Sequence, residues 1–165
     1  WVKTNGFNPG GGLTLDGNAY LEQYSPDEYA AIQWLKNAPY GTIAEAVSPT
    51  GGSYSGYARY ATNTGLPNVV GWQFHESQWR GGMNEVDSRP EDIQTLYTTP
   101  NWDEAKQIID KYHIRYVVID DLERSTYRLN DAKFQRMLRV AFQQGNVIIY
   151  EVPEPELIQT SGAGN

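Results

Sequence analysis

Apolar residues recur at helical spacing in three stretches of this chain, at 26–37, 89–97 and 102–112. Residues three and four positions apart lie on the same face of a helix, so this spacing is typical of an amphipathic helix. The first stretch also has a start signal, because Ser25 can cap a helix and Pro26 suits its first position. The pattern therefore predicts three helices.

Two more stretches predict helices. The stretch 54–64 is followed by Gly65, a residue that commonly ends a helix. The stretch 130–142 has apolar residues at helical spacing, and Gly145 is expected to stop it.

Four shorter apolar stretches have the length and composition of strands. They lie at 42–47, 68–72, 114–120 and 146–152. Strands that alternate with helices predict an α/β fold: a small, mainly parallel sheet of about four strands, flanked by helices in Rossmann-like layers. We expect an irregular lead-in at 1–19, a single domain at 20–152 and a frayed tail at 153–165.

Composition narrows the possible functions. The chain has 165 residues and a net charge of −7, which disfavours binding to nucleic acid. It has no cysteine, which excludes disulfides, thiolate catalysis and cysteine-bound zinc. The 12 tyrosines and 5 tryptophans suggest a docking face or a sugar-binding surface, with a tyrosine-rich core as the alternative.

No apolar stretch is long enough to span a membrane. The chain begins at Trp1 and not at methionine, so we expect it to be part of a longer protein.

The first candidate site follows the first predicted strand, in the Gly/Ser turn that leads to Tyr54 and Ser55. Backbone N–H groups at a helix start can hold an anion. The turn matches neither the phosphate-binding glycine motifs nor the hydrolase GxSxG motif. An ordinary helix-start turn is the alternative interpretation.

The second candidate site follows the second predicted strand and contains His75, Glu76, Trp79 and Arg80. The histidine and the glutamate could act as an acid/base pair, and the tryptophan and arginine could stack on a sugar or phosphate. A polar network that only orders the loop is the alternative. Because the other histidine, His113, lies at a predicted helix end, we expect no bound metal and no cofactor.

The third candidate site contains Asp120, Asp121, Glu123 and Arg124, with Tyr127 beyond them. Carboxylates at a strand end could bind Mg²⁺ or a sugar hydroxyl, although paired aspartates also begin ordinary helices. Ligands of open parallel sheets sit beyond the carboxyl ends of the strands. We therefore expect all three candidate sites to meet at that edge.

Residues spread over the chain carry a family resemblance. In the first part of the chain they are Thr14-Leu15-Asp16-Gly17, Tyr20, Tyr29-Ala30-Ala31-Ile32-Gln33-Trp34-Leu35, Tyr54-Ser55, Arg59 and Thr64-Gly65-Leu66-Pro67. In the remainder they are Gly71-Trp72, His75-Glu76, Gln78-Trp79-Arg80, Arg89, Asp92-Ile93, Leu96-Tyr97, Tyr116-Val117, Leu122-Glu123-Arg124, Tyr127 and Lys133-Phe134. Together they resemble the carboxy-terminal soluble part of the YYY-type multi-spanning membrane proteins of bacteria and archaea. The resemblance covers about residues 13–152, and the Tyr-Tyr-Tyr motif that names the family is absent from this segment.

That family resembles membrane glycosyltransferases of the GT-C class, which use lipid-linked sugar donors. The resemblance implies a domain on the extracytoplasmic face of the membrane, with its own transmembrane region as partner. Such an accessory domain would bind part of a glycan, acceptor or lipid-linked saccharide, or stabilise the membrane part. The resemblance also places catalysis in the membrane part, so the isolated domain is not expected to turn over substrate. The alternatives are a stand-alone hydrolase or transferase that uses His75 and Glu76, and a purely structural domain.

Overall fold

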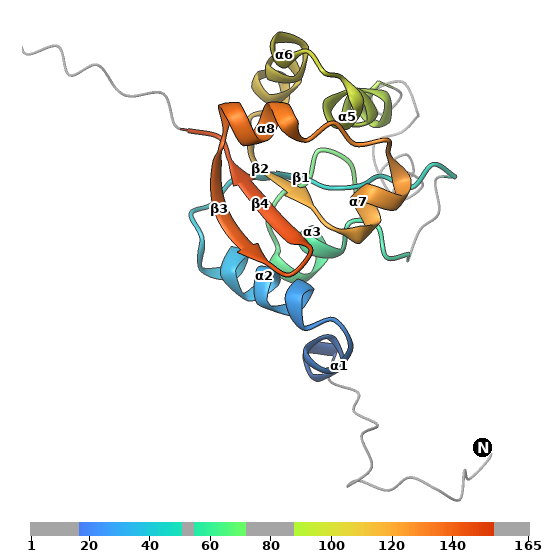
Figure 1. The fold of residues 1–165 in the computed structure, drawn as a ribbon. Helices are drawn as coiled ribbons and strands as arrows, with labels where there is room; N and C mark the ends of the chain where they lie inside the picture. The colour runs from blue at the N-terminus through green and yellow to red at the C-terminus, as the bar shows by residue number, and fades with distance from the viewer. Residues whose placement is uncertain (1–16, 51–54, 72–87, 154–165) are drawn as a thin grey trace, which may run out of the picture.

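The computed structural model describes residues 17–50, 55–71 and 88–153. They form a mixed α/β fold with one four-stranded sheet and helices on both of its faces (Figure 1). The helices are α1 (Gly17–Tyr24), α2 (Pro26–Asn37), α3 (Arg59–Thr64), α5 (Arg89–Thr98), α6 (Trp102–Tyr112), α7 (Asp121–Thr126) and α8 (Ala132–Met137). The strands are β1 (Thr42–Ala44), β2 (Ile114–Ile119), β3 (Arg139–Gln144) and β4 (Val147–Glu151).

The sheet is mixed, and the prediction of a mainly parallel sheet is wrong. Its order is β1-β2-β4-β3. Only β1 and β2 run parallel, whereas β4 pairs antiparallel with both β2 and β3. The reason is local: β3 and β4 are joined by a two-residue connection, which can only link antiparallel strands.

The long helix predicted at 130–142 is also wrong in its second half. Helix α8 ends at Met137, and the chain continues as strand β3. Gly145 does not stop a helix but forms the hairpin turn with Asn146, where its φ of 51° suits a tight connection. By spacing, Phe142 continues the helical pattern of Phe134 and Leu138, and pairing with β4 decides for the strand.

The first two predicted strands are shorter than expected. β1 ends at Ala44 because the next backbone donors leave the ladder: Ala46 donates to the carboxylate of Glu123, and Val47 donates to the hydroxyl of Tyr127. Of the stretch predicted at 68–72, the described residues 68–71 contribute an isolated bridge between Asn68 and Ile43 and no named strand. A strand needs a continuous ladder, so this segment is a connection.

The three most strongly patterned helices are confirmed as α2, α5 and α6. The side chain of Asn101 caps α6 by accepting a hydrogen bond from the backbone of Asp103 at 2.9 Å. Helix α3 is shorter than the predicted 54–64, but it ends as expected at Gly65, whose φ is 75°. The structure adds helix α1, which the sequence pattern did not indicate.

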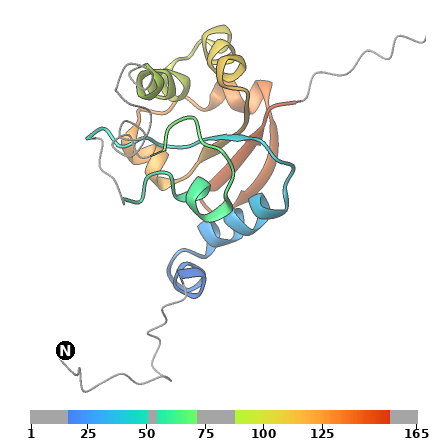
Figure 2. The same cartoon turned by 180° about the vertical axis from the view of Figure 1, so that it is seen from behind.

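Alternate residues of the central strands bury into two separate cores, so helices cover both faces (Figures 1 and 2). Tyr116 and Val118 of β2 face helices α2 and α3, and this core also contains Ile32, Leu35, Tyr60 and Ile149. Val117 and Ile119 face α5, α6 and α8, and this core also contains Leu96, Ile108, Phe134 and Tyr150. The sheet is thus a rigid support whose end can present side chains.

Within the described ranges, every helix is too short or too polar to cross a membrane.

Candidate functional site

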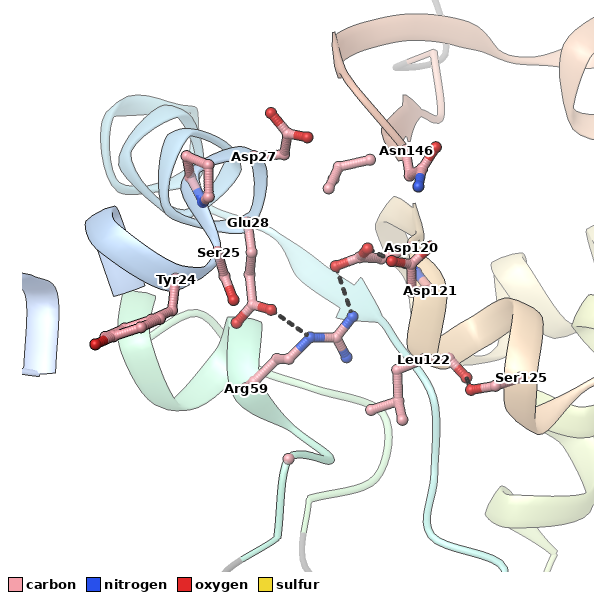
Figure 3. Close-up of a pocket in the computed structure, with 13 residues that line it drawn as sticks. Tyr24, Ser25, Asp27, Glu28, Arg59, Asp120, Asp121, Leu122, Ser125 and Asn146 are labelled. Atoms are coloured by element: carbon pink, nitrogen blue, oxygen red, sulfur yellow. Dashed lines mark hydrogen bonds and ion pairs between the residues drawn. The ribbon is translucent and has the colours of Figure 1, made fainter. Parts of the chain in front are cut away.

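A cleft of about 610 Å³ opens at the end of the sheet where β2 finishes and β4 begins (Figure 3). Its walls come from five places: the end of α1, the start of α2, the start of α3, the start of α7 and the turn between β3 and β4. We call it the Arg59 cleft, and its charged lining residues are Asp27, Glu28, Arg59, Asp120 and Asp121. Four carboxylates against one guanidinium make this cleft acidic.

Arg59 is held by three carboxylates, which we call the Arg59 cluster. Its Nη2 lies 2.8 Å from Oδ2 of Asp120 and 3.2 Å from Oε2 of Glu123. Its Nε lies 3.3 Å from Oε2 of Glu28, so the guanidinium sits between α2 and α7 (Figure 3). Only 11% of the Arg59 side chain is exposed, so solvent and salt screen these charges less than they screen surface ion pairs.

Asp120 is both a helix cap and a member of this cluster. Its Oδ1 accepts from the backbone of Asp121 at 2.6 Å, and Glu123 accepts from the backbone of Asp120, completing a capping box at α7. Its Oδ2 accepts from the hydroxyl of Tyr60 at 2.7 Å. Burial acts to raise the pKa of Asp120, but the hydrogen bonds from Tyr60 and Arg59 outweigh it and hold the pKa below its usual value.

Glu123 is fully buried and ties α7 to the end of β1. Its Oε1 accepts from the backbone N–H of Ala46 at 2.8 Å, across 77 positions of sequence. Its other oxygen accepts from Asp120 and Arg59. Glu123 is not among the lining residues, so it lies behind the cleft and holds Arg59 and Asp120 in place.

Glu45, the residue after β1, is a second fully buried carboxylate. It accepts from the backbone N–H groups of Tyr60 and Ala61, both at 3.0 Å, and from the side chain of Asn68 at 2.9 Å. Burial raises the pKa of Glu45 to about 7, against the lowering effect of the two backbone hydrogen bonds.

The rim of the cleft is formed by more exposed residues. Tyr24 is 61% exposed, and Asp121 is also exposed. Asp27 accepts a hydrogen bond from the side chain of Gln144 at 3.0 Å, which joins the start of α2 to the hairpin. Burial is the largest cause that raises the pKa of Glu28, which lies deeper beside Arg59.

Some of the predicted site residues lie in the described part of the chain, and the others lie outside it. Glu123 and Arg124 are on α7: Glu123 lies behind the cleft, and Arg124 is exposed and donates to the backbone carbonyl of Asn146 at 2.7 Å. Ser55 is exposed, and its neighbour Gly56 lines the cleft. The other predicted residues, Tyr54, His75, Glu76, Trp79 and Arg80, lie outside the described residues, so their meeting with α7 stays a prediction.

Sequence reasoning missed Glu28, Glu45 and Arg59 as site residues. Arg59 was noticed only as part of the family resemblance. Glu45 had a readable signal, because it is a single acidic residue inside the apolar stretch 42–47. A charge in such a stretch is either on an exposed face or buried with partners, and the structure shows the second case.

In the described part of the chain, no group of three or more acidic or histidine side chains is arranged to hold a metal ion. Three carboxylates, those of Glu28, Asp120 and Glu123, instead lie against the single positive charge of Arg59.

No family model and no curated protein matches the chain. Among solved structures, the chain is similar to the C-terminal globular domain of an oligosaccharyltransferase from Archaeoglobus fulgidus. The TM-score is 0.49 and the sequence identity is 15%. The match covers 77% of this chain and 97% of that chain.

Proposed function

We propose that this chain is an extracytoplasmic accessory domain of an integral membrane glycosyltransferase, and that the Arg59 cleft binds a neutral part of a glycan. The first half rests on the sequence resemblance to the GT-C-like membrane family. The second half rests on one observation: four carboxylates and one exposed tyrosine line the same cleft.

Carboxylates suit the recognition of sugars because an ionised carboxylate only accepts hydrogen bonds, and sugar hydroxyls can donate them. Asp27 and Asp121 lie on the rim, where a ligand can reach them. Tyr24 also lines the cleft, and its ring, an apolar surface with a polar edge, lies on the side of Ser25 and Glu28 and points away from Asp121 (Figure 3). This combination of a few polar groups with an aromatic wall is typical of small-ligand sites.

The same charges disfavour phosphate. All three nitrogens of the Arg59 guanidinium have carboxylate partners, so its charge is already neutralised. The lining carboxylates outnumber it and would repel a diphosphate. A lipid-linked donor would therefore bring its saccharide to this cleft, not its diphosphate.

The predicted residues His75, Glu76, Trp79 and Arg80 belong to the same proposal as a second contact for the glycan. Catalysis is assigned to the membrane part, and the domain would shape the acceptor side or stabilise that part. Membrane spans in the full-length parent protein are expected, and a parent without them would contradict the membrane half of the proposal.

Glycan-array binding of the purified domain, followed by NMR titration with the oligosaccharides that bind, tests the cleft. We expect shifts at Tyr24, Asp27 and Asp121, and none with inorganic pyrophosphate. Tyr24→Ala should weaken binding about fivefold or more, which is ~1 kcal/mol. Tyr40→Ala is the matched control, because Tyr40 is 74% exposed and lines a different pocket.

Absence of oligosaccharide binding, or binding that Tyr24→Ala and Asp121→Asn leave unchanged, would contradict the glycan role. The purely structural alternative would then be the better account of the Arg59 cluster. Turnover of sugar substrates that disappears in His75→Ala or Glu76→Ala would favour the stand-alone enzyme instead.

A further inference from the structure

The short helix that carries Arg59 has no cap of its own. Helix α3 has six residues, and the residue before it is Ala58, whose side chain cannot accept a hydrogen bond. Ala58 also has a φ of 61°, in the left-handed region. The backbone N–H groups of Tyr60 and Ala61 are those that a capping side chain normally satisfies.

Glu45 supplies this missing cap from the end of β1. One carboxylate oxygen accepts from Tyr60 and the other from Ala61, both at 3.0 Å. Two hydrogen bonds to one planar group fix both the position and the rotation of the first turn. Arg59 is the first residue of that turn, so the same contact aims its side chain.

The contacts then close into a ring. Arg59 reaches Glu123, and Glu123 accepts from the backbone of Ala46, the residue next to Glu45. Each member is buried or nearly so. A displacement of Glu45 would therefore be transmitted to α3 and to the carboxylates around Arg59.

We propose that Glu45 is a positioning residue for the Arg59 cleft, and that the protonation state of its carboxylate sets how firmly Arg59 is clamped between Glu28 and Asp120. The link from Glu45 to ligand binding rests on the proposed function of the cleft. The geometry itself involves no ligand.

The ionised and neutral forms of Glu45 differ in what they can hold. An ionised carboxylate accepts at both oxygens, whereas a protonated one carries a donor on one of them. The neutral form must therefore release or weaken one backbone contact of α3. The pKa of about 7 places this change near neutral pH.

The groups that face Glu45 come from three helices. Glu123 on α7 raises the pKa of Glu45, and Arg59 on α3 lowers it. Burial is the main cause that raises the pKa of the Tyr97 phenol on α5, and the negative charge of Glu45 adds to it. Glu28 on α2 acts through Arg59: its carboxylate lies 3.3 Å from Nε of Arg59, and its own pKa is raised, mainly by burial.

The test is an NMR pH titration of the Arg59 Nε–H signal, assigned by its loss in Arg59→Lys. It is performed in Glu28→Gln protein, because Glu28 would otherwise titrate beside the same nitrogen. We expect the Arg59 signal, the Tyr60 and Ala61 amides and the Glu45 side-chain carboxyl carbon to share one midpoint near pH 7. In Glu45→Gln, the pH response of the Arg59 signal should disappear.

An Arg59 signal that does not follow the carboxyl midpoint of Glu45 would overturn the proposal. So would an unchanged titration in Glu45→Gln. The comparison of midpoints needs no substitution at position 45, so it stays decisive even if Glu45→Gln fails to fold. No saccharide enters the experiment, and so its outcome can be read whether or not the glycan proposal holds.

Discussion

The Nη2 atom of Arg59 lies 2.8 Å from the Oδ2 atom of Asp120, and this contact joins two helices that are 61 positions apart in sequence. Asp120 begins α7 and Arg59 begins α3, so the ion pair locks two helix starts together at the end of the sheet. The stability of this corner and the shape of the cleft therefore depend on the same few side chains.

Arg59→Met should destabilise the domain strongly. It would leave Glu28, Asp120 and Glu123 close together without a counter-charge, a situation that costs about 3 kcal/mol or more. Urea denaturation measures the change in free energy of unfolding. Arg136→Met, at an exposed position, is the matched control and should change it by less than about 0.5 kcal/mol. Equal effects of the two substitutions would contradict the central role of Arg59.

The buried carboxyl of Glu45 should make stability fall as the pH rises from about 4.5 to 7. Its pKa is raised from 4.5 to about 7, so over this range the folded protein binds more protons than the unfolded chain. The whole effect is on the order of 3 kcal/mol. Denaturation curves across this range should show the slope in the native sequence and a reduced slope in Glu45→Gln.

Glu91→Gln is the control for that titration, because Glu91 is exposed on α5. It should keep the native slope. A Glu45→Gln protein with the same slope as the native sequence would show that Glu45 does not titrate in this range.

Lys133 should have the opposite effect at alkaline pH. It is fully buried and donates to the carbonyl of Asn130 at 2.6 Å, and burial lowers its pKa to about 8. Between about pH 8 and 10.5 the unfolded chain binds more protons, so stability should rise with pH, by about 3 kcal/mol in all.

The rise is measured as the difference between the native sequence and Lys133→Met, because other groups titrate in the same range. Lys106→Met, at a half-exposed lysine of α6, should leave the rise intact. If the free energy of unfolding still rises with pH in Lys133→Met, another group causes the rise.

Gly41→Ala should destabilise the start of β1. A Cβ at this position would lie 2.5 Å from Cβ of Arg115, an atom that cannot move without the backbone of β2. We expect a cost of about 1–3 kcal/mol, the usual range for overpacking. Gly56→Ala is the control, since a Cβ there meets nothing within 4 Å. Thermal denaturation compares the melting temperatures of the two variants. Similar values for Gly41→Ala and Gly56→Ala would contradict the close contact at Gly41.

The sequence by itself determined the elements whose signals are local. Pro26 at the first position and the apolar spacing of 102–112 predicted α2 and α6, because helix-start preferences and amphipathic packing act within a few residues. The expected side-chain cap by Ser25 is not formed. The apolar runs of β2 and β4 were equally readable, since strands buried on both faces are continuously apolar.

The tertiary structure decided whatever depends on partners distant in sequence. Phe142 continues the helical spacing of Phe134 and Leu138, and only pairing with β4 makes it part of a strand, which also makes the sheet mixed. β1 ends early because α7, 77 positions later, takes its backbone donor at Ala46. The cleft also depends on partners distant in sequence. Arg59 and the three carboxylates around it form no motif along the chain, and only folding brings their charges together.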